Sequence, residues 1–173
     1  MLTTLNKIRY NPLEEKPCRA GWEQLLKALG KTKADDEALH LRTILDINGL
    51  DDAIWCLRAV EGYDREIRLF AVWCARRVQH LMTDQRSLNA LDVSERYANG
   101  QASAEELKAA REAAWEAKWG AAWDAAGAAA WEAARAAWHA TRLGERAAQE
   151  AELRRMLNCT DNNVDPYPYK QDT

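Results

Sequence analysis

Residues 45–82 read LDINGLDDAIWCLRAVEGYDREIRLFAVWCARRVQHLM and contain two apolar stretches, each with its own helix start and stop signals. Asp51 or Asp52 can cap the first helix by accepting a hydrogen bond from a free backbone N–H. Gly62 can end that helix, because glycine adopts the left-handed conformation without a steric penalty. Asp64 can then cap a second helix. The pattern predicts a pair of helices at the centre of an all-α protein.

The second of these helices has an apolar stripe that we expect to face the core. Its apolar residues recur at helical spacing, and further apolar residues widen the surface beyond the stripe. A helix that is apolar over more than half of its circumference is usually buried by several neighbours. Arg65, Arg68 and Arg76 share the remaining side, where we expect carboxylate partners. The stripe consists of Ile67, Phe70, Ala71, Cys74, Val78 and Leu81.

The central segment GLDDAIWCLRAVEGYDREIRLFAVWCARRVQHLM, followed by ALDVSERYANG, resembles a family of immunity proteins. This type-5-immunity-like family is associated with polymorphic toxin systems and also occurs in phage and prophage genomes. The resemblance extends from about Gly21 to Leu157 and includes GWEQLLKALGKTKADD upstream. It implies a protein that binds another protein, and it brings no catalytic motif with it.

Length and charge exclude several classes of protein. A chain of 173 residues can form one domain with a sizeable core. The net charge of −3 and the pI near 5.7 argue against non-specific nucleic-acid binding, which needs a basic surface. The start MLTTLNKIRYNP lacks the apolar part of a secretory signal, and no apolar run approaches the length of about 20 residues that spans a bilayer. We therefore expect a cytoplasmic protein that does not enter a membrane.

The cysteines and histidines do not match a known chemical site. The four cysteines form no CxxC pair and are predicted to be buried, reduced thiols. Cys56, Cys74 and His80 could be imagined around a metal, but their spacing matches no zinc module. The sequence has no P-loop, GxGxxG, GxSxG or HExxH motif. We expect no catalytic residue, no metal and no cofactor, and hence no enzyme.

The chain is predicted to contain four consecutive regions. Residues 1–20 are a lead-in interrupted by prolines, and residues 21–100 form a compact bundle of short helices. Residues 101–157 form a long, Ala/Trp-rich, Gly-kinked helical segment that packs on the bundle. Residues 158–173 form a flexible tail, in which the Asp-Pro-Tyr-Pro-Tyr sequence cannot be helical.

Two further helix starts can be located. Thr83 or Asp84 is predicted to cap one helix, and Ser103 with Glu106 fits a capping box at the start of the Ala/Trp-rich segment. One unbroken helix through that segment would be about 80 Å long, which exceeds the width of a compact domain of this size. We therefore expect kinks or turns, for which the candidate positions are Gly120, Gly127 and Gly144.

The tryptophans of the Ala/Trp-rich segment wind around the helix axis. Trp115, Trp119 and Trp123 are four residues apart, and each such step advances about 40° around an ideal helix. One interpretation is that these rings pack against the N-terminal helices or against a second copy of the chain, which would give a homodimer. The other is an exposed aromatic ridge for a partner, because tryptophan is enriched at interface hot spots. The ridge would comprise Trp123, Trp131 and Trp138.

Four carboxylates lie around the two ends of the first central helix. Helix capping accounts for Asp51, Asp52 and Asp64, because carboxylates stabilise helix N-termini. The alternative is an acidic patch, completed by Glu61, that attracts a basic protein. We take all four as candidate partner-binding residues.

The function predicted from the sequence is that of a non-catalytic, immunity-type inhibitor. Such a protein binds and masks a partner protein, here a toxin or an immune effector. A first alternative is a phage-encoded counter-defence inhibitor of a bacterial immune complex. A second alternative is a structural protein that oligomerises through the Ala/Trp helices. In each case we expect a protein partner, and neither a membrane nor nucleic acid.

Overall fold

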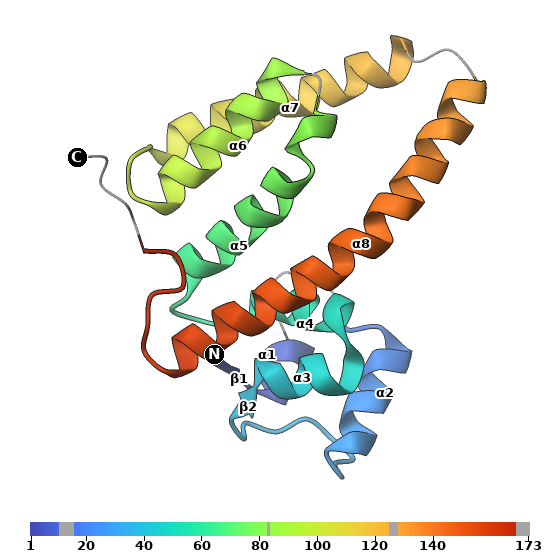
Figure 1. Ribbon diagram of the computed structural model, residues 1–173. Helices are drawn as coiled ribbons and strands as arrows, with labels where there is room; N and C mark the ends of the chain where they lie inside the picture. Colours follow the sequence, from blue (N-terminus) through green and yellow to red (C-terminus); the bar gives the residue numbers. More distant parts are fainter. Residues whose placement is uncertain (11–15, 83, 125–127, 169–173) are drawn as a thin grey trace. The chain divides into compact units, whose positions relative to one another are not determined.

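A computed structural model of the chain confirms the predicted all-α class (Figure 1). The residues described are 1–10, 16–82, 84–124 and 128–168, with side chains described at all of these except 81 and 116–144. Within these ranges the structure has eight α-helices, two 3-10 helices and one pair of short strands. In chain order the elements are β1 (Leu2–Thr3), α1 (Leu5–Arg9), α2 (Arg19–Ala28), β2 (Leu39–His40), α3 (Leu41–Asn48), α4 (Leu50–Cys56), η1 (Leu57–Ala59), α5 (Asp64–Arg77), η2 (Gln79–Leu81), α6 (Gln85–Ala98), α7 (Ala104–Asp124) and α8 (Ala128–Asp161).

The chain forms two compact units, each of which combines segments that are distant in the sequence. Unit 1 contains Met1–Asp64 and Leu153–Pro166, whereas unit 2 contains Arg65–Glu152 and Tyr167–Thr173. Helix α8 therefore contributes residues to both units. The first residues of the chain, which we predicted to be part of a lead-in, form β1 and α1 and belong to unit 1.

The core of unit 1 joins the N-terminal helices to the end of α8. Helix α3 contacts both α2 and α4, and β1 pairs with β2 in antiparallel register. Figure 1 shows the last turns of α8 beside β1. Burial of each large aliphatic side chain stabilises the fold by about 1.5–3 kcal/mol. The largest fully buried side chains described all lie in this unit: Leu5, Ile8, Leu41, Ile44, Leu153, Met156 and Leu157.

Ion pairs also connect the two segments of unit 1. The amino group of Met1 pairs with Asp161 at 2.5 Å, and Arg154 pairs with Asp46 at 2.6 Å. Helix α8 continues as far as Asp161, so the first residues of the predicted tail, 158–173, are helical. Asp161, in the last turn, pairs with a residue 160 positions earlier, and the bond between Arg154 and Asp46 spans 108 positions.

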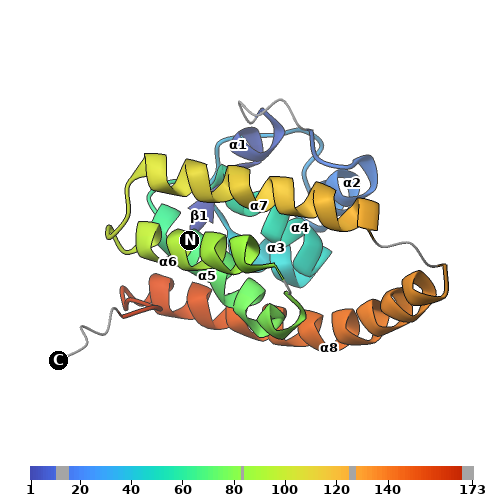
Figure 2. The same ribbon diagram turned by 90° about the horizontal axis from the view of Figure 1, so that it is seen from above.

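In unit 2, helices α6 and α7 lie side by side as a helical hairpin (Figure 2). Val93 of α6 packs with Leu107 and Ala110 of α7 in a buried cluster. Partly buried side chains surround this cluster, among them Tyr97. The small alanine permits the two helices to approach closely, and the larger side chains exclude water from the seam.

Two of the predicted helix starts are confirmed. Asp84 is the N-cap of α6, and its Oδ1 accepts a hydrogen bond from the Arg86 N–H at 2.8 Å. Ser103 and Glu106 form the predicted capping box at the start of α7. The Ser103 Oγ accepts from the Glu106 N–H at 3.1 Å, and the Glu106 Oε2 accepts from the Ser103 N–H at 2.8 Å.

Helix α5 buries a face that is rotated relative to the predicted stripe. Phe70 is buried as predicted, but Ala71 is exposed, and that part of the prediction was wrong. Leu69 and Val72, which belong to the apolar residues predicted to widen the stripe, are buried as well. Larger apolar side chains gain more from burial than alanine does, and a periodicity argument that weights all apolar residues equally does not include this difference. The side chain of Leu81 lies outside the described residues.

The arginines of α5 find partners within unit 2. Arg76 forms ion pairs with Asp92 at 2.7 Å and with Glu95 at 2.6 Å, which confirms the expected carboxylate partners for this residue. Arg68 instead lies over the Tyr97 ring, with its guanidinium carbon 5.0 Å from the ring centroid. A guanidinium is thus accommodated either by carboxylates or by an aromatic face.

The Ala/Trp-rich segment forms two helices, α7 and α8, and not one rod. Gly120 and Gly144 lie inside these helices, whereas Gly127 lies outside the described residues. The backbones of Trp123, Trp131 and Trp138 are helical, but their side chains are also outside the described part. None of the helices in the described ranges is both long enough and apolar enough to cross a membrane.

Candidate functional site

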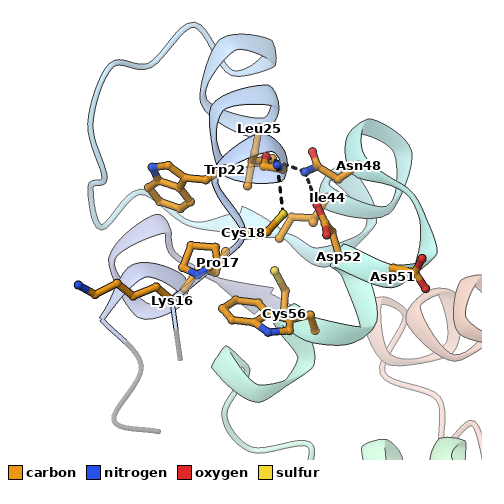
Figure 3. Close-up of a pocket in the computed structure, with 13 residues that line it drawn as sticks. Lys16, Pro17, Cys18, Trp22, Leu25, Ile44, Asn48, Asp51, Asp52 and Cys56 are labelled. Carbon is orange, nitrogen blue, oxygen red and sulfur yellow. Dashed lines mark hydrogen bonds between the residues drawn. The ribbon is translucent and has the colours of Figure 1, made fainter. Parts of the chain in front are cut away.

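Unit 1 contains a cavity with both acidic and aromatic walls (Figure 3). Its volume is about 310 Å³, which is at the lower end of the range for ligand pockets. Side chains from α1, α2, α3 and α4 line it, together with residues that precede α2. The lining residues that bear on its chemistry are Cys18, Trp22, Asn48, Asp51, Asp52 and Trp55.

Helix α2 begins in the wall of this cavity. Cys18 is its N-cap, and the Cys18 Sγ accepts a hydrogen bond from the Gly21 N–H at 3.3 Å. Trp22 and Leu25 are three residues apart, which places them on one face of the helix, and both line the cavity. Leu25 is buried and Trp22 is half-buried. The helix is therefore anchored through Leu25 and presents the Trp22 ring at the cavity surface.

Gly21 permits a close approach between α2 and α4. A Cβ atom at this position would overlap the Asp52 Oδ2 and would lie 3.1 Å from the Cys18 Sγ. The Gly21 carbonyl oxygen accepts a hydrogen bond from the Asn48 Nδ2 at 2.8 Å. Glycine leaves room here for the Asp52 carboxylate, which would have to move if position 21 carried a Cβ atom.

Asn48, at the end of α3, connects α2 and α4. Its Nδ2 donates to the Gly21 carbonyl and also to the Asp52 Oδ2, the latter at 2.6 Å. Its Oδ1 is buried and has no donor among the described residues. A buried acceptor without a donor typically costs about 1–3 kcal/mol, and in native proteins it often marks a functional site.

The two aspartates do not cap α4, and this prediction was wrong. Gly49 is the N-cap residue, with a φ of 84°, and α4 has no side-chain cap in the described structure. Asp51 and Asp52 instead lie in the first turn, where carboxylates interact favourably with the helix dipole. Asp51 is exposed and Asp52 is half-buried. Because capping does not use them, both carboxylates can line the cavity.

The Cys56 thiol in the cavity wall is chemically inert near neutral pH. Burial raises the pKa of Cys56 to about 12, and the negative charge of Asp52 adds to the increase. A thiol that stays protonated is neither a nucleophile nor a metal ligand. The negative charge of Asp52 therefore makes the Cys56 thiol harder to deprotonate and does not activate it.

The prediction that all the cysteines are buried was wrong. Cys56 is buried, but Cys18 is exposed, and Cys74 and Cys159 are half-buried. All four are free thiols. Cys18 is exposed because its sulfur caps the start of α2. The free N–H groups of a helix start need an acceptor, and the sulfur provides one at the surface.

An arginine guanidinium of this chain lies over the ring of each of the two tryptophans of the cavity. The guanidinium carbon of Arg9 lies 5.4 Å from the centroid of the Trp22 ring, and that of Arg58 lies 4.5 Å from the centroid of the Trp55 ring. These are cation–π distances. Arg9 and Arg58 do not belong to the described lining of the cavity, so they contact the rings from outside it.

The structure brings together only part of the predicted acidic patch. Asp51 and Asp52 line the cavity, whereas Glu61 forms an exposed ion pair with Lys7 at 2.9 Å. Asp64 is the first residue of α5 and does not line the cavity. Such exposed ion pairs contribute at most about 1 kcal/mol to the free energy of unfolding. Glu61 is paired with Lys7, and this pair therefore adds little stability.

Sequence reasoning missed several residues of this cavity. Helical spacing shows Trp22 only as one more apolar position of a short helix, and Asn48-Gly49 only as a helix end. The Gly-Trp dipeptide at 21–22 was a weak signal, because glycine within a helix often marks a close approach. Nothing in local spacing connects it with Asp52.

A smaller cavity of about 200 Å³ lies in unit 2 between α5, α6 and α7. Arg68 and Arg111 line it together with apolar side chains such as Val72 and Leu107. Its charge is opposite to that of the cavity in unit 1. Neither cavity holds a cluster of three or more His, Cys, Asp or Glu residues suited to a metal, as far as the structure describes the chain.

Comparison with protein-family models, with curated proteins and with solved structures found no match to this chain. The resemblance to immunity proteins therefore stays a prediction from the sequence. The chain is an all-α protein with a preformed cavity whose walls combine carboxylates with tryptophan rings.

Proposed function

We propose that this chain is a non-catalytic binding protein that masks a partner protein, as an immunity-type inhibitor does. The observation that carries the proposal is the unit 1 cavity, whose lining includes both Asp51 and Asp52 and both Trp22 and Trp55. Tryptophan supplies much of the binding energy at protein interfaces, and carboxylates select basic partners. Carboxylates and tryptophan rings are therefore suited to binding a protein. The buried thiol of Cys56, in the same cavity wall, stays protonated.

The charge of the chain supports a basic partner. The net charge is −3, and among the charged lining residues of the unit 1 cavity two carboxylates, Asp51 and Asp52, stand against one cation, Lys16. Long-range attraction between opposite charges speeds association, and this effect weakens as salt increases. A toxin or an immune effector that binds nucleic acid would have the required basic surface. The four free thiols fit the reducing cytoplasm as the place of action.

A pulldown from host cells followed by mass spectrometry tests the proposal. The affinity tag belongs at the C-terminus, because the amino group of Met1 pairs with Asp161. A recovered protein is then purified, and its activity is measured against increasing amounts of this chain. We expect inhibition that is complete at a fixed stoichiometry. A recovered protein whose activity is unchanged at saturation would contradict a masking function.

A matched pair of variants links the activity to the cavity. Asp51→Asn with Asp52→Asn removes two charges from the cavity, and Asp36→Asn with Glu112→Gln removes two from exposed positions elsewhere. We expect the first pair to slow association about tenfold at low salt and the second to have little effect. Equal association rates for the two pairs would place the binding surface elsewhere.

The counter-defence alternative has the same mechanism and a different partner. A neighbouring toxin gene supports an immunity protein, and neighbouring phage accessory genes support a counter-defence inhibitor. The oligomerisation alternative is favoured by Trp115 on α7, whose side chain is 60% exposed. Tryptophan is enriched at the hot spots of protein interfaces, including those between two copies of a chain.

A further inference from the structure

We infer that the unit 1 cavity receives the guanidinium group of one arginine side chain from a protein partner. The inference rests on the proposed function for the source of the arginine, and it adds the chemistry by which the partner is recognised. A guanidinium requires negative charge, an aromatic surface and hydrogen-bond acceptors. The cavity walls contain all three.

Asp52 supplies the charge inside the cavity. Its Oδ2 accepts the hydrogen bond from Asn48, while its Oδ1 has no partner in the described part of the chain. An ionised carboxylate has acceptor sites on both oxygens, so the second oxygen can accept from a ligand. Figure 3 shows the Asp52 carboxylate turned toward Asn48 and Cys18, and the Asp51 carboxylate turned away from them. Asp52 is therefore the anchor, and Asp51 adds charge at the exposed rim.

The tryptophan rings provide flat surfaces for a planar cation. Each ring already holds one guanidinium of this chain, Arg9 on Trp22 and Arg58 on Trp55. Both tryptophans belong to the described lining of the cavity, whereas neither arginine does. The rings are also held in place by these contacts, which reduces the entropy lost when a ligand binds.

Asn48 positions the anchor. Its Nδ2 donates to the Asp52 Oδ2 at 2.6 Å, which holds the carboxylate in place at the cavity wall. A guanidinium has five N–H donors in a fixed fork. It can therefore donate more than one hydrogen bond to the Asp52 carboxylate while its flat face lies against a ring, which a compact ammonium group does less well.

The shape of the cavity favours one arginine over other cations. A volume of about 310 Å³ is enough for a single long side chain. Lysine has a compact, strongly hydrated ammonium group that neither stacks on a ring nor forks to a carboxylate. Lys16 also lines the cavity, and Figure 3 shows its side chain extended away from Asp52, so it does not neutralise the anchor.

The test uses small probes and the full chain, so that it does not depend on recovering a partner. Nα-acetyl-arginine amide is titrated into the 15N-labelled protein, and the indole N–H signals of Trp22 and Trp55 are followed by NMR. Nα-acetyl-citrulline amide is the neutral isostere, and Nα-acetyl-lysine amide is the alternative cation. We expect saturable shifts of both signals with the arginine probe and binding at least about tenfold weaker with the other two.

Variants locate the site. Asp52→Asn keeps the shape of the side chain and its bond to Asn48, and should weaken binding of the arginine probe about tenfold. Trp22→Phe keeps an aromatic ring and should weaken it about threefold. Glu112→Gln removes an exposed carboxylate from α7 and should leave binding unchanged. Thermal melts and NMR spectra establish that each variant is folded, and the comparison of arginine with citrulline requires no variant.

Four outcomes would overturn the inference. The first is that the citrulline probe binds as tightly as the arginine probe, and the second is that the arginine probe binds a folded Asp52→Asn protein as tightly as the wild type. The third is that free arginine binds but the blocked arginine probe does not. The fourth is that a recovered partner binds the chain while no probe shifts the signals of Trp22 or Trp55. In the last case the proposed function stands and the arginine receptor fails. If the arginine probe binds as expected but the chain inhibits no recovered partner, the cavity does bind arginine and the proposed masking function is wrong.

Discussion

Gly21 allows the backbone of α2 to lie against the Asp52 carboxylate. A methyl group on Gly21 would overlap the Asp52 Oδ2. We predict that Gly21→Ala lowers the free energy of unfolding by about 1–3 kcal/mol, the usual effect of overpacking, even though alanine favours a helix by up to about 1 kcal/mol. Urea denaturation measures the change.

A double variant separates the clash from other effects of the alanine. Asp52→Ala removes the overlapping oxygen, so the effect of Gly21→Ala should be smaller when both substitutions are present. A double-mutant cycle gives the coupling between the two residues. A Gly21→Ala protein with wild-type stability would show that α2 and α4 do not approach this closely in solution.

Burial makes the Cys56 thiol a pH-dependent contributor to stability. It raises the pKa of Cys56 from the ordinary value of 9.0 to about 12, with a smaller effect from Asp52. The folded protein holds this proton more tightly than the unfolded chain. The stabilisation is therefore complete below about pH 9 and is lost as the pH rises toward about 12. We predict that the free energy of unfolding falls across this window by at most about 1.4 kcal/mol per pH unit.

Two measurements check this prediction. Urea denaturation at several pH values should show a shallower decline for Cys56→Ala than for the wild type. Alkylation at mildly alkaline pH should modify the exposed Cys18 quickly and Cys56 only after unfolding. Similar alkylation rates for the two thiols in the folded protein would contradict the prediction.

Helix α5 depends on Phe70, which is 3% exposed. We predict that Phe70→Ala lowers the free energy of unfolding by about 3–5 kcal/mol, because it leaves a cavity that the neighbours cannot fill. Ala71→Ser is the control at the adjacent, exposed position and should change stability by less than about 0.5 kcal/mol. Thermal melting that differs from wild type by only a degree or two for Phe70→Ala would show that α5 is not a core helix.

Helix starts show where local reasoning works and where it fails. The capping contacts of Asp84 and Ser103 involve residues no more than three positions away, and both were predicted. The start of α4 was assigned to Asp51 or Asp52, but Gly49 both ends α3 and begins α4. The left-handed φ of Gly49 turns the chain between the two helices within one residue, so no carboxylate cap is needed.

The end of α8 closes the core of unit 1. Leu157 is 1% exposed and packs in the same unit as the N-terminal helices. We predict that Leu157→Ala lowers the free energy of unfolding by about 2–5 kcal/mol and shifts NMR signals of β1 and α1. Ala151→Ser, at an exposed position of the same helix, is the control. Unchanged β1 and α1 signals would show that the two segments fold separately.

The association state of the molecule tests whether the tryptophans of the Ala/Trp-rich segment bind a second copy of the chain. If they bind a second copy, light scattering should report a homodimer, because a large apolar surface left in water favours association. Replacing Trp119, Trp123 and Trp131 with glutamine should then give a folded monomer. A wild-type monomer at high micromolar concentration would favour packing within one chain.

The all-α class, the confirmed helix starts and the central place of Phe70 were determined by the sequence alone. The class and the helix starts depend on contacts within a few residues, whose geometry a regular helix dictates, and Phe70 was singled out because it lies on an apolar stripe. The sequence also singled out Asp51 and Asp52, although for a capping role that the structure does not support.

The cavity and the closure of unit 1 were decided only by the tertiary structure. Trp22, Asn48 and Asp52 come from three helices, and Leu157 joins their unit from the other end of the chain. Helical spacing says which side of a helix is apolar but not which other helix covers it. That choice depends on how side chains of different size fill one shared interior, with Gly21 leaving the space that the Asp52 carboxylate occupies.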